Sequence, residues 1–183
     1  MKVAVYSGSF NPLHKGHEAI LRHLTRDGRY GRVLLVVTPQ NPFKDKADDA
    51  PQRLQAAKQA ILRHSDIKAD VSDIELRMPP PQYTIRTLDA LKKENPGDDF
   101  TLVVGADCLA GFKGWKEYSR ILTEYGLVVF PRKGYHRGHL KAQLLRESPD
   151  YRIELLKAPL VTVSSTFIRE GLQEGKDMTK WLM

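Results

Sequence analysis

Short apolar runs alternate with segments of helical spacing along most of the chain. The strand-like runs are 2–7, 32–39, 67–76, 100–107, 126–131 and 151–158. The helix-like segments are 16–26, 51–64, 84–95, 108–125, 139–148 and 164–175. Runs such as 32–39, which are apolar at nearly every position, are typical of strands buried on both faces. The alternation predicts an α/β fold, with one doubly wound domain over residues 1–183 that has a parallel sheet and helices on both faces.

Glycines, histidines and short polar motifs directly follow several of these predicted strands. In open parallel sheets, ligands bind beyond the carboxyl ends of the strands. The segments that would lie at this edge are 8–17, 39–44, 105–107 and 164–169. We therefore expect the functional residues to come mainly from these segments.

The segment after the first strand combines Gly8 with two histidines, His14 and His17. The glycine permits a phosphate to approach main-chain N–H groups, and a helix that starts at residue 15 or 16 adds unpaired N–H groups and partial positive charge. Both imidazoles are expected in the first turn, about 5–6 Å apart on one side of the helix. This arrangement suits an anion better than a cation, because the helix N-terminus already repels positive charge and Glu18 is the only carboxylate near enough to help hold a metal. Taken alone, the pair is also typical of a helix cap at the surface.

Other catalytic motifs of similar composition do not match. The string HEAIL (17–21) has leucine where the metalloprotease motif HExxH has its second histidine. Neither a Walker A sequence nor G-x-G-x-x-G occurs, and Ser7 and Ser9 do not lie in a G-x-S-x-G elbow. A second H-x-x-H string, at 136–139, does not follow a strand through a Gly-Pro turn and is interpreted as a basic loop. P-loop hydrolysis, ordinary dinucleotide binding and esterase chemistry are therefore disfavoured.

The composition is that of a soluble globular protein, with 41% hydrophobic and 28% charged residues. No apolar stretch reaches the roughly 18 residues of a membrane span, and the first residues lack signal-peptide features. The single cysteine, Cys108, excludes an internal disulfide and fits a cytoplasmic location. The net charge of +7 favours anionic partners, but the cations are scattered and no aromatic RNA-binding motif accompanies them, which disfavours nucleic acid.

Two longer motifs resemble those of a known family. The string GSFNPLHKGH (8–17) resembles the G-x-F-x-P-x-H-x-G-H signature of the nucleotidyltransferase superfamily, whose members have a Rossmann-like fold. The string VSSTFIR (163–169) resembles its I-S-S-T-x-I-R motif. The strings NPFK (41–44), QYTIRTL (82–88) and GADCLAGFKGW (105–115) are similar to the nicotinate and nicotinamide mononucleotide adenylyltransferases. The resemblance implies transfer of AMP from ATP to a pyridine mononucleotide, which gives the dinucleotide and pyrophosphate in NAD biosynthesis.

The resemblance also implies a role for each matching residue. The expected catalytic residues, which also bind the ATP phosphates, are His14, His17 and Arg169. The expected ATP-binding set adds Gly8, Ser9, Phe10, Gly105, Asp107, Ser164, Ser165 and Thr166. The expected acceptor-binding set is Asn11, Lys44, Tyr83, Thr84 and Trp115. Within these sets Asp107 is expected near the ribose, and Trp115 is expected to stack on the pyridine ring. No residue is expected to bind metal directly, because Mg²⁺ would be held mainly by phosphate oxygens and water.

Some of these residues also have a purely structural explanation. Ser164 or Thr166 can cap the last helix, and Asp107 can cap the helix after the fourth strand. Trp115 can belong to the core. The reaction itself requires no general base, because a phosphomonoester has its second pKa at about 6 and is largely a dianion at neutral pH. It requires electropositive groups that position two anions and stabilise the departing pyrophosphate.

The match departs from the family pattern at a few positions. These are Asn11 for Asp, Phe43 for His, Gln82 for Ser, Arg86 for Asp and Lys133 for Pro. All except Asn11 lie on the expected acceptor side, so the choice between nicotinate and nicotinamide stays open, although the added cation Arg86 favours the acid. The alternatives are a related nucleotidyltransferase with an acceptor such as phosphopantetheine, a non-catalytic nucleotide or nucleic-acid binder, and a metal-dependent hydrolase. The oligomeric state is also open, and a homo-oligomer is compatible with the sequence.

Overall fold

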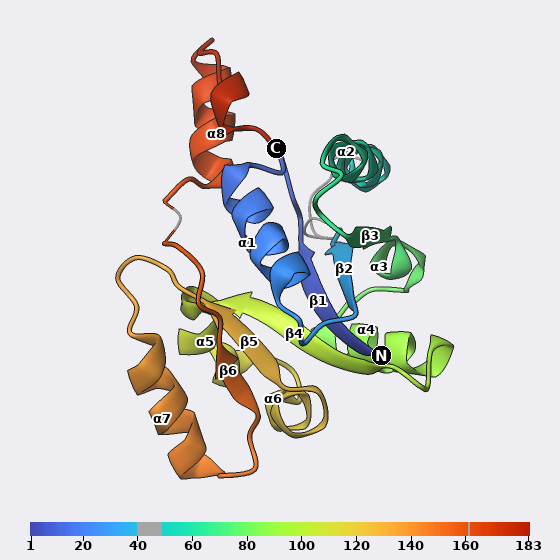
Figure 1. Ribbon diagram of the computed structural model, residues 1–183, viewed down its shortest axis with the longest axis vertical. Helices are drawn as coiled ribbons and strands as arrows, with labels where there is room; N and C mark the ends of the chain where they lie inside the picture. Colours follow the sequence, from blue (N-terminus) through green and yellow to red (C-terminus); the bar gives the residue numbers. More distant parts are fainter. Residues whose placement is uncertain (40–48, 161) are drawn as a thin grey trace.

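A parallel six-stranded sheet forms the centre of the computed structural model, which describes residues 1–39, 49–160 and 162–183. The strands are β1 (Lys2–Gly8), β2 (Arg32–Val37), β3 (Ala69–Ser72), β4 (Asp99–Gly105), β5 (Leu127–Phe130) and β6 (Ile153–Leu155). They lie in the order β3-β2-β1-β4-β5-β6, and every neighbouring pair is parallel. The order winds outward in both directions from β1 and β4, so the predicted doubly wound fold is confirmed (Figure 1).

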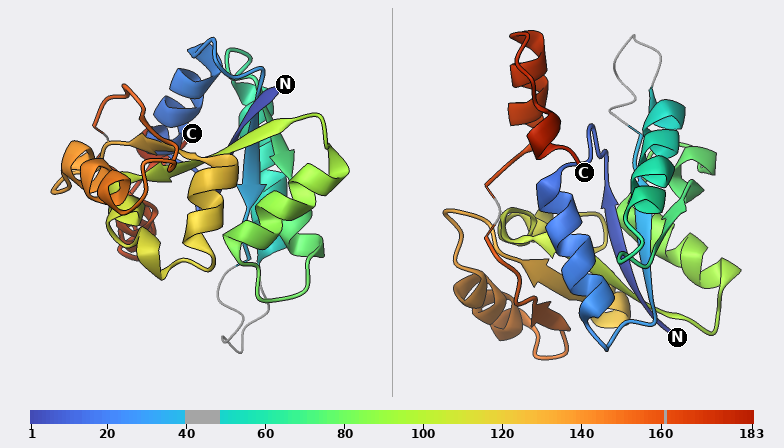
Figure 2. Two further views of the ribbon diagram at one scale, coloured as in Figure 1. Left: turned by 90° about the horizontal axis from the view of Figure 1, so that it is seen from below. Right: turned by 45° about the horizontal axis from the view of Figure 1, so that its top comes forward.

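Helices cover both faces of the sheet (Figure 2). The α-helices are α1 (Lys15–Arg26), α2 (Ala50–Arg63), α3 (Ile74–Arg77), α4 (Thr84–Glu94), α5 (Ala106–Ala110), α6 (Tyr118–Arg120), α7 (Arg137–Glu147) and α8 (Ser165–Gln173). Two 3₁₀-helical turns are η1 (Phe112–Gly114) and η3 (Thr179–Trp181), and η2 (Ile121–Tyr125) is a short π-helix. Buried side chains of α1 and α2 pack on one face of the sheet, and those of α4, α5 and α7 pack on the other.

Successive residues of β1 enter opposite cores, because side chains alternate along a strand. Val3 and Val5 pack in the cluster that contains α4, whereas Ala4 and Tyr6 pack in the cluster that contains α1. All four side chains are buried. Because β1 is buried on both faces, its successive residues are apolar instead of alternating between apolar and polar.

The strand predicted over 67–76 is wrong in its second half. β3 pairs with β2 only as far as Ser72, which lies opposite Val36, and β2 itself ends one residue later. Residues 74–77 therefore have no strand to pair with. They form the helical turn α3, in which the N–H groups of Leu76 and Arg77 donate to the carbonyl of Asp73. The run over 151–158 is likewise a strand only at β6, where it pairs with β5.

The helical region predicted over 108–125 is interrupted in the structure. α5 ends immediately before Gly111, and η1 ends at Gly114. Glu117 then adopts a left-handed backbone conformation with φ of 51°. Glycine has a low helix propensity and a left-handed residue cannot continue a right-handed helix, so this stretch consists of short helices joined by turns.

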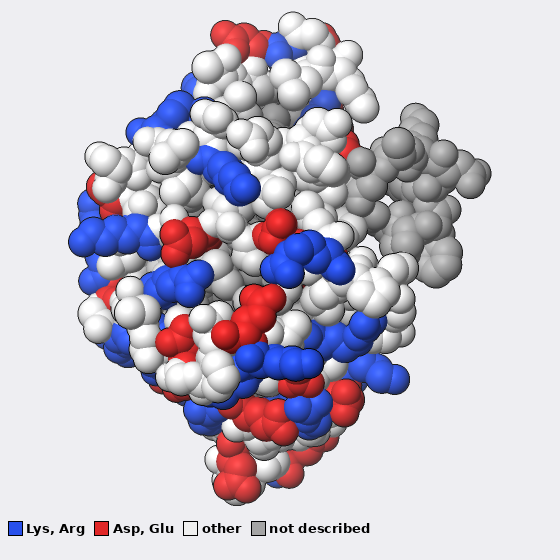
Figure 3. All heavy atoms as spheres, turned by 90° about the vertical axis from the view of Figure 1, so that its right-hand side faces the viewer, with Lys and Arg blue, Asp and Glu red and all other residues white. Residues whose placement is uncertain are grey.

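In the part of the chain that the structure describes, no helix has both the length and the apolar character needed to cross a membrane. Figure 3 shows the face on which α2, α3 and α4 lie, where acidic and basic side chains are interspersed. Some of them pair, as Arg32 does with Asp70 and Arg77 with Asp73. The described residues of this face therefore form no continuous basic patch of the kind typical of nucleic-acid binding.

We expect Leu35→Ala to lower the free energy of unfolding by about 2–5 kcal/mol, because the fully buried side chain in β2 would leave a cavity beneath α1 and α2. Urea unfolding followed by circular dichroism measures this change. Leu62→Ala, at an exposed position of α2, is the matched control and should change stability by less than about 0.5 kcal/mol. Equal effects of the two substitutions would contradict this assignment of the core.

Candidate active site

The loop between β1 and α1, residues 9–14, is a packed hinge at the carboxyl edge of the sheet. β1 ends at Gly8, and α1 begins after His14, close to where the sequence predicts its start. A Cβ added to Gly8 would lie 3.2 Å from the ring of Phe10, so the glycine permits a close approach. Phe10 is buried, and its ring meets those of Tyr6 and His17 edge-on, with centroids 5.4 and 5.0 Å away. The hinge is thus filled by aromatic rings.

His14 and His17 cap α1 reciprocally. Nδ1 of His14 accepts a hydrogen bond from the backbone N–H of Gly16 at 3.0 Å, and Nδ1 of His17 accepts one from the backbone N–H of His14 at 3.1 Å. The rings stack with their centroids 3.7 Å apart. The pair is a helix cap, but a buried one, since His14 is only 4% exposed. Because Nδ1 is the acceptor in each neutral ring, the proton resides on Nε2, and both imidazoles offer an Nε2–H donor.

Both imidazoles are neutral at pH 7 in the free protein. Burial, together with the positive charge of Arg132, lowers the pKa of His14 from 6.5 to about 4. Burial, His14 and the same arginine hold the pKa of His17 well below its usual range. The two rings can therefore offer an anion hydrogen-bond donors but no positive charge.

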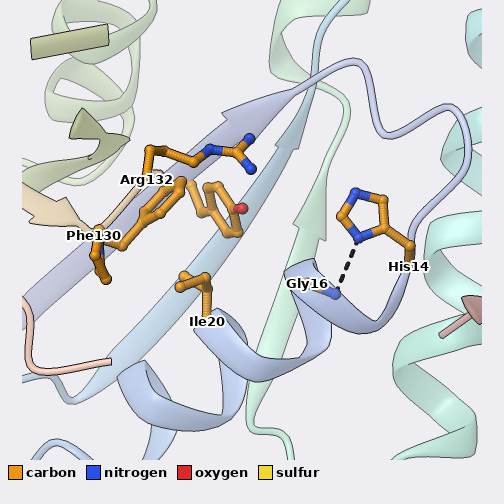
Figure 4. A pocket seen from close by; sticks show the side chains of 7 residues that line it. His14, Gly16, Ile20, Phe130 and Arg132 are labelled. Atoms are coloured by element: carbon orange, nitrogen blue, oxygen red, sulfur yellow. Dashed lines mark hydrogen bonds between the residues drawn. The ribbon is translucent and has the colours of Figure 1, made fainter. Parts of the chain in front are cut away.

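A cation at this edge comes from Arg132, which the sequence analysis did not assign to the site. Its guanidinium lies 5.6 Å from the centroid of the Phe130 ring, and its Nε lies 3.7 Å from a carboxylate oxygen of Asp107. This Nε is buried and has no hydrogen-bond partner among the described residues. Figure 4 shows Arg132 and His14 around a small cavity of about 10 Å³, roughly the room for one water molecule. The sequence contains one sign of this role, because Arg132 closely follows β5 and therefore lies at the carboxyl edge of the sheet.

A larger cleft of about 230 Å³ is bordered by the carboxyl ends of β1 and β4. The predicted ATP-binding residues that line it are Gly8, Ser9, Phe10, His17, Gly105, Asp107 and Ser165. From the predicted acceptor set, Trp115 lines it. Its lining also includes Tyr6, Cys108 and Arg132, which the sequence analysis did not assign. Segments that are far apart in sequence thus meet at one edge, as a parallel sheet requires.

The start of α8 is bonded directly to the hinge. Ser165 donates from Oγ to the carbonyl of Pro12 at 3.0 Å. Arg169 donates from Nη1 to the carbonyl of Asn11 at 2.6 Å. These bonds join the two sequence motifs, although they lie at opposite ends of the chain.

Ser164 caps α8, since its Oγ accepts a hydrogen bond from the backbone N–H of Phe167 at 3.1 Å. Thr166 has a different role, because its hydroxyl accepts from Nη2 of Arg169 at 3.3 Å. The sequence leaves open whether Ser164 or Thr166 caps this helix, and in the structure the cap is Ser164. The guanidinium of Arg169 is held at both ends, by Thr166 and by the hinge.

α5 follows β4 without an intervening loop, and its N-cap is Gly105. The expectation that Asp107 caps this helix is wrong, because Asp107 lies inside the first turn and its carboxylate is turned toward Arg132. A Cβ at Gly105 would lie 2.5 Å from that carboxylate and 2.9 Å from the ring of Phe130, so a side chain there would displace its neighbours. Trp115 stacks on Phe112 at 4.7 Å and packs partly against the core, and it also lines the cleft. Trp115 thus packs partly against the core, and its stacking on the pyridine ring stays a prediction.

The remaining predicted acceptor residues lie outside the cleft lining or outside the described residues. Tyr83 and Thr84 begin α4, where the ammonium of Lys116 lies 5.7 Å from the centroid of the half-exposed Tyr83 ring. Neither residue lines the cleft. Asn11 contributes the carbonyl that holds Arg169. Lys44, like Phe43, lies outside the described residues, so its role stays a prediction.

Arg53 in α2 holds the hinge from the other side. Its guanidinium is buried and donates from Nη1 to the carbonyls of Ser9 and Thr38, at 2.6 and 2.8 Å. Its Nε also pairs with Asp49 at 2.7 Å. Arg53 therefore links the loop after β1 to the end of β2. The sequence gives no sign of this role, because Arg53 is one basic residue among many on a helix.

Comparison with known proteins identifies the family of this chain. The model of the cytidylyltransferase-like family matches residues 5–171, so the chain is a nucleotidyltransferase of this class. A protein of Bacteroides fragilis named "probable nicotinate-nucleotide adenylyltransferase" is 40% identical over 99% of this chain and 87% of its own length. A protein of Flavobacterium johnsoniae with the same name is 37% identical over 97% of this chain and 90% of its own. The chain belongs to the nicotinate-nucleotide adenylyltransferase family.

A solved structure has the same fold. The nicotinic acid mononucleotide adenylyltransferase of Plasmodium falciparum, complexed with NaAD, superposes with a TM-score of 0.80 over 99% of this chain and 90% of that one. The two sequences are only 19% identical, so the superposition is evidence for the fold of this chain and not for its function. The Rossmann-like architecture predicted from the two motifs is confirmed.

We expect the stability of the protein to fall as the pH is lowered from 6.5 to 4, because the unfolded chain binds a proton at His14 in this range and the folded chain does not. His14→Asn should make this fall shallower, since an Asn side chain caps α1 without titrating. Urea unfolding at pH 7 and pH 4.5 measures the difference. His139→Asn, at an exposed position of α7, is the control and should keep the wild-type pH dependence. An unchanged pH dependence in His14→Asn would contradict the assigned protonation state.

Proposed function

We propose that this chain transfers the adenylyl group of MgATP to nicotinate mononucleotide, with release of pyrophosphate, as a step in NAD biosynthesis. The observation that carries this proposal is the set of donors gathered at one edge of the sheet. The imidazoles of His14 and His17 come from the start of α1, and the guanidinium of Arg169 comes from α8, which is bonded to the same hinge. Such donors suit a polyphosphate chain.

The relatives support the choice of substrates. The proteins of Bacteroides fragilis and Flavobacterium johnsoniae are named for this activity and match this chain along nearly its whole length. The Plasmodium falciparum enzyme has been solved with NaAD and, in a second structure, with APC. A protein with this fold is therefore known to bind such ligands.

In the proposed reaction, an oxygen of the acceptor phosphate attacks the α-phosphorus of ATP. A new P–O bond forms there while the bond from the α-phosphorus to the bridging oxygen breaks, and the electron pair leaves with pyrophosphate. The attacking dianion needs no deprotonation, so the protein supplies position and charge stabilisation. His14 and His17 donate from Nε2 to phosphate oxygens, and these bonds strengthen as negative charge builds on the leaving group.

Arg169 binds the terminal phosphates in this proposal, because contacts with Asn11 and Thr166 already fix the direction of its fork of donors. The backbone amides of Ser165 and Thr166, in the first turn of α8, add to the same anion site. Arg132 supplies a further cation at the cleft, where its side chain is about one-third exposed.

The adenosine of ATP is assigned to the part of the cleft that lies between β1 and β4. This part is bordered by main chain and by one aromatic ring, which come from Gly8, Ser9, Phe10 and Gly105. Asp107 is assigned to the ribose hydroxyls, since its carboxylate is at the cleft and about two-fifths exposed.

The pyridine mononucleotide is assigned to the side of Trp115, whose ring would stack on the pyridine. The family resemblance adds four further residues to this proposed acceptor site, which are Asn11, Tyr83, Thr84 and Lys44. Arg86 gains no support as a ligand of the nicotinate carboxylate, because its guanidinium donates to the carbonyls of Pro79 and Pro81. The preference for nicotinate therefore rests on the names of the relatives.

Magnesium fits this site as part of the MgATP substrate. No cluster of three or more His, Cys, Asp or Glu side chains suited to a metal ion occurs among the described residues. Among the described residues that line the cleft, His17 and Arg132 offer N–H donors, which bind phosphate rather than a cation, and Asp107 is a single carboxylate. Mg²⁺ keeps much of its water and readily binds through substrate phosphates, where it neutralises charge. The same donor chemistry disfavours a metal-dependent hydrolase built on His14 and His17.

We expect His17→Ala to lower kcat by roughly 10²–10³ without unfolding the protein, because it removes one donor to the phosphates. Release of pyrophosphate from ATP, Mg²⁺ and nicotinate mononucleotide measures the rate, and circular dichroism checks the fold. His23→Ala is the matched control, since His23 lies on the same helix but away from the cleft. A near-normal rate in His17→Ala would exclude the assigned role.

A panel of acceptors tests the substrate assignment. Nicotinate mononucleotide should give faster pyrophosphate release than nicotinamide mononucleotide, and phosphopantetheine should give none. A clear preference for the amide would show that the acid is not the physiological acceptor. Turnover with phosphopantetheine alone would overturn the assignment to pyridine nucleotides.

A further inference from the structure

The last residues of the sequence, 178–183, fold back onto the hinge. Leu182 forms an antiparallel bridge with His14, and the N–H of Met183 donates to the carbonyl of Leu13 at 3.5 Å. The side chain of Met183 is buried in the core cluster beneath α1. In Figure 1 the end of the chain accordingly lies beside the start of α1. This segment therefore contacts the backbone of the residue that caps the candidate phosphate site.

The same segment covers the apolar side of α8. Met178 is buried in a small cluster with Val163 and Ile168, separate from the two cores that flank the sheet. A Cβ added at Gly171 of α8 would overlap the side chain of Met178, so helix and segment are in close contact. Trp181 meets the ring of Phe167 edge-on, with centroids 5.6 Å apart. Figures 1 and 2 show α8 projecting beyond the sheet layers, so its burial depends largely on the 178–183 segment.

A third contact anchors the segment to the body of the protein. Arg63, at the end of α2, donates from Nη2 to the carbonyl of Met183 at 3.1 Å. The segment is thus held between α8, the start of α1 and the end of α2. It joins the small cluster of α8 to a main core, because Met178 belongs to the first and Met183 to the second.

We propose that the 178–183 segment is a positioning element, which sets the place of α8 relative to the start of α1. Arg169 on α8 and the His14–His17 pair on α1 would bind one triphosphate, so their separation must match it. The bonds of Ser165 and Arg169 to the hinge fix one end of α8, and the segment fixes its orientation by packing along the helix. This inference rests on the proposed function for the identity of the bound phosphates.

Removal of Leu182 and Met183 tests the proposal in the full enzyme. The affinity for MgATP should fall about tenfold and kcat should fall with it, because groups displaced by about an ångström bind and stabilise charge poorly. The KM for the mononucleotide should change little. Calorimetry with MgATP alone measures affinity, initial rates give kcat and KM, and thermal unfolding checks the fold. Unchanged affinity for MgATP in a folded protein would overturn the proposal.

A pair of substitutions decides the question even if the deletion unfolds the protein. Gly171→Ala should weaken MgATP binding by pushing Met178 away from α8, and the double variant with Met178→Ala should recover it, since the shorter side chain leaves room. Leu172→Ala, at an exposed position of α8, is the control and should bind MgATP normally. Normal binding in Gly171→Ala, or no recovery in the double variant, would overturn the proposal. Wild-type MgATP binding without turnover of any mononucleotide would instead refute the proposed reaction.

Discussion

The reciprocal hydrogen bonds between His14, His17 and the first turn of α1 are the constraint on which the candidate site depends. Each Nδ1 accepts from a backbone N–H that would otherwise have no partner at a helix start. The same bonds fix the ring orientation and place the proton of each ring on Nε2. The cap of the helix and the proposed binding of phosphate thus use the same pair of side chains. Neither role by itself requires histidine, since Ser or Asp, for example, can also cap a helix.

Burial gives the pair its electrostatic character. The imidazoles lie close to Arg132, and three adjacent cations would repel one another in the absence of an anion. With the pKa of His14 at about 4 and that of His17 also low, only the arginine is charged at neutral pH. Its buried Nε has no hydrogen-bond partner among the described residues, although a carboxylate oxygen of Asp107 lies 3.7 Å away. In the proposed reaction, this cation and the two Nε2–H donors would be in place before the ligand arrives, which is how electrostatic stabilisation is most effective.

The hinge is held in place by contacts that come from several directions. Arg53 binds its carbonyl at Ser9 from α2, and Ser165 and Arg169 bind its carbonyls at Pro12 and Asn11 from α8. Main-chain carbonyls are the acceptors in all three contacts. Side chains of the hinge, such as the ring of Phe10, are consequently left to pack the core or to border the cleft.

Much of the architecture follows from the sequence. Continuous apolar runs indicate strands buried on both faces, and their alternation with helices leaves a parallel sheet as the simplest arrangement. The motifs at 8–17 and 163–169 follow directly on predicted strands, so their meeting at one edge is also foreseeable. The ends of strands were less predictable. Whether residues 74–77 form a strand or a helix depends on where the neighbouring strand β2 ends. The pattern of apolar and polar residues within 67–76 carries no information about that.

The sequence by itself determined the class of fold, the two motifs of the site and the family to which they point, because these depend on periodicity and on residues close together in the chain. The tertiary structure alone decided the protonation of the histidines, the presence of Arg132 beside them and the return of residues 178–183 to the hinge. These properties depend on burial and on distances between residues far apart in sequence. Neither quantity exists until the chain has folded.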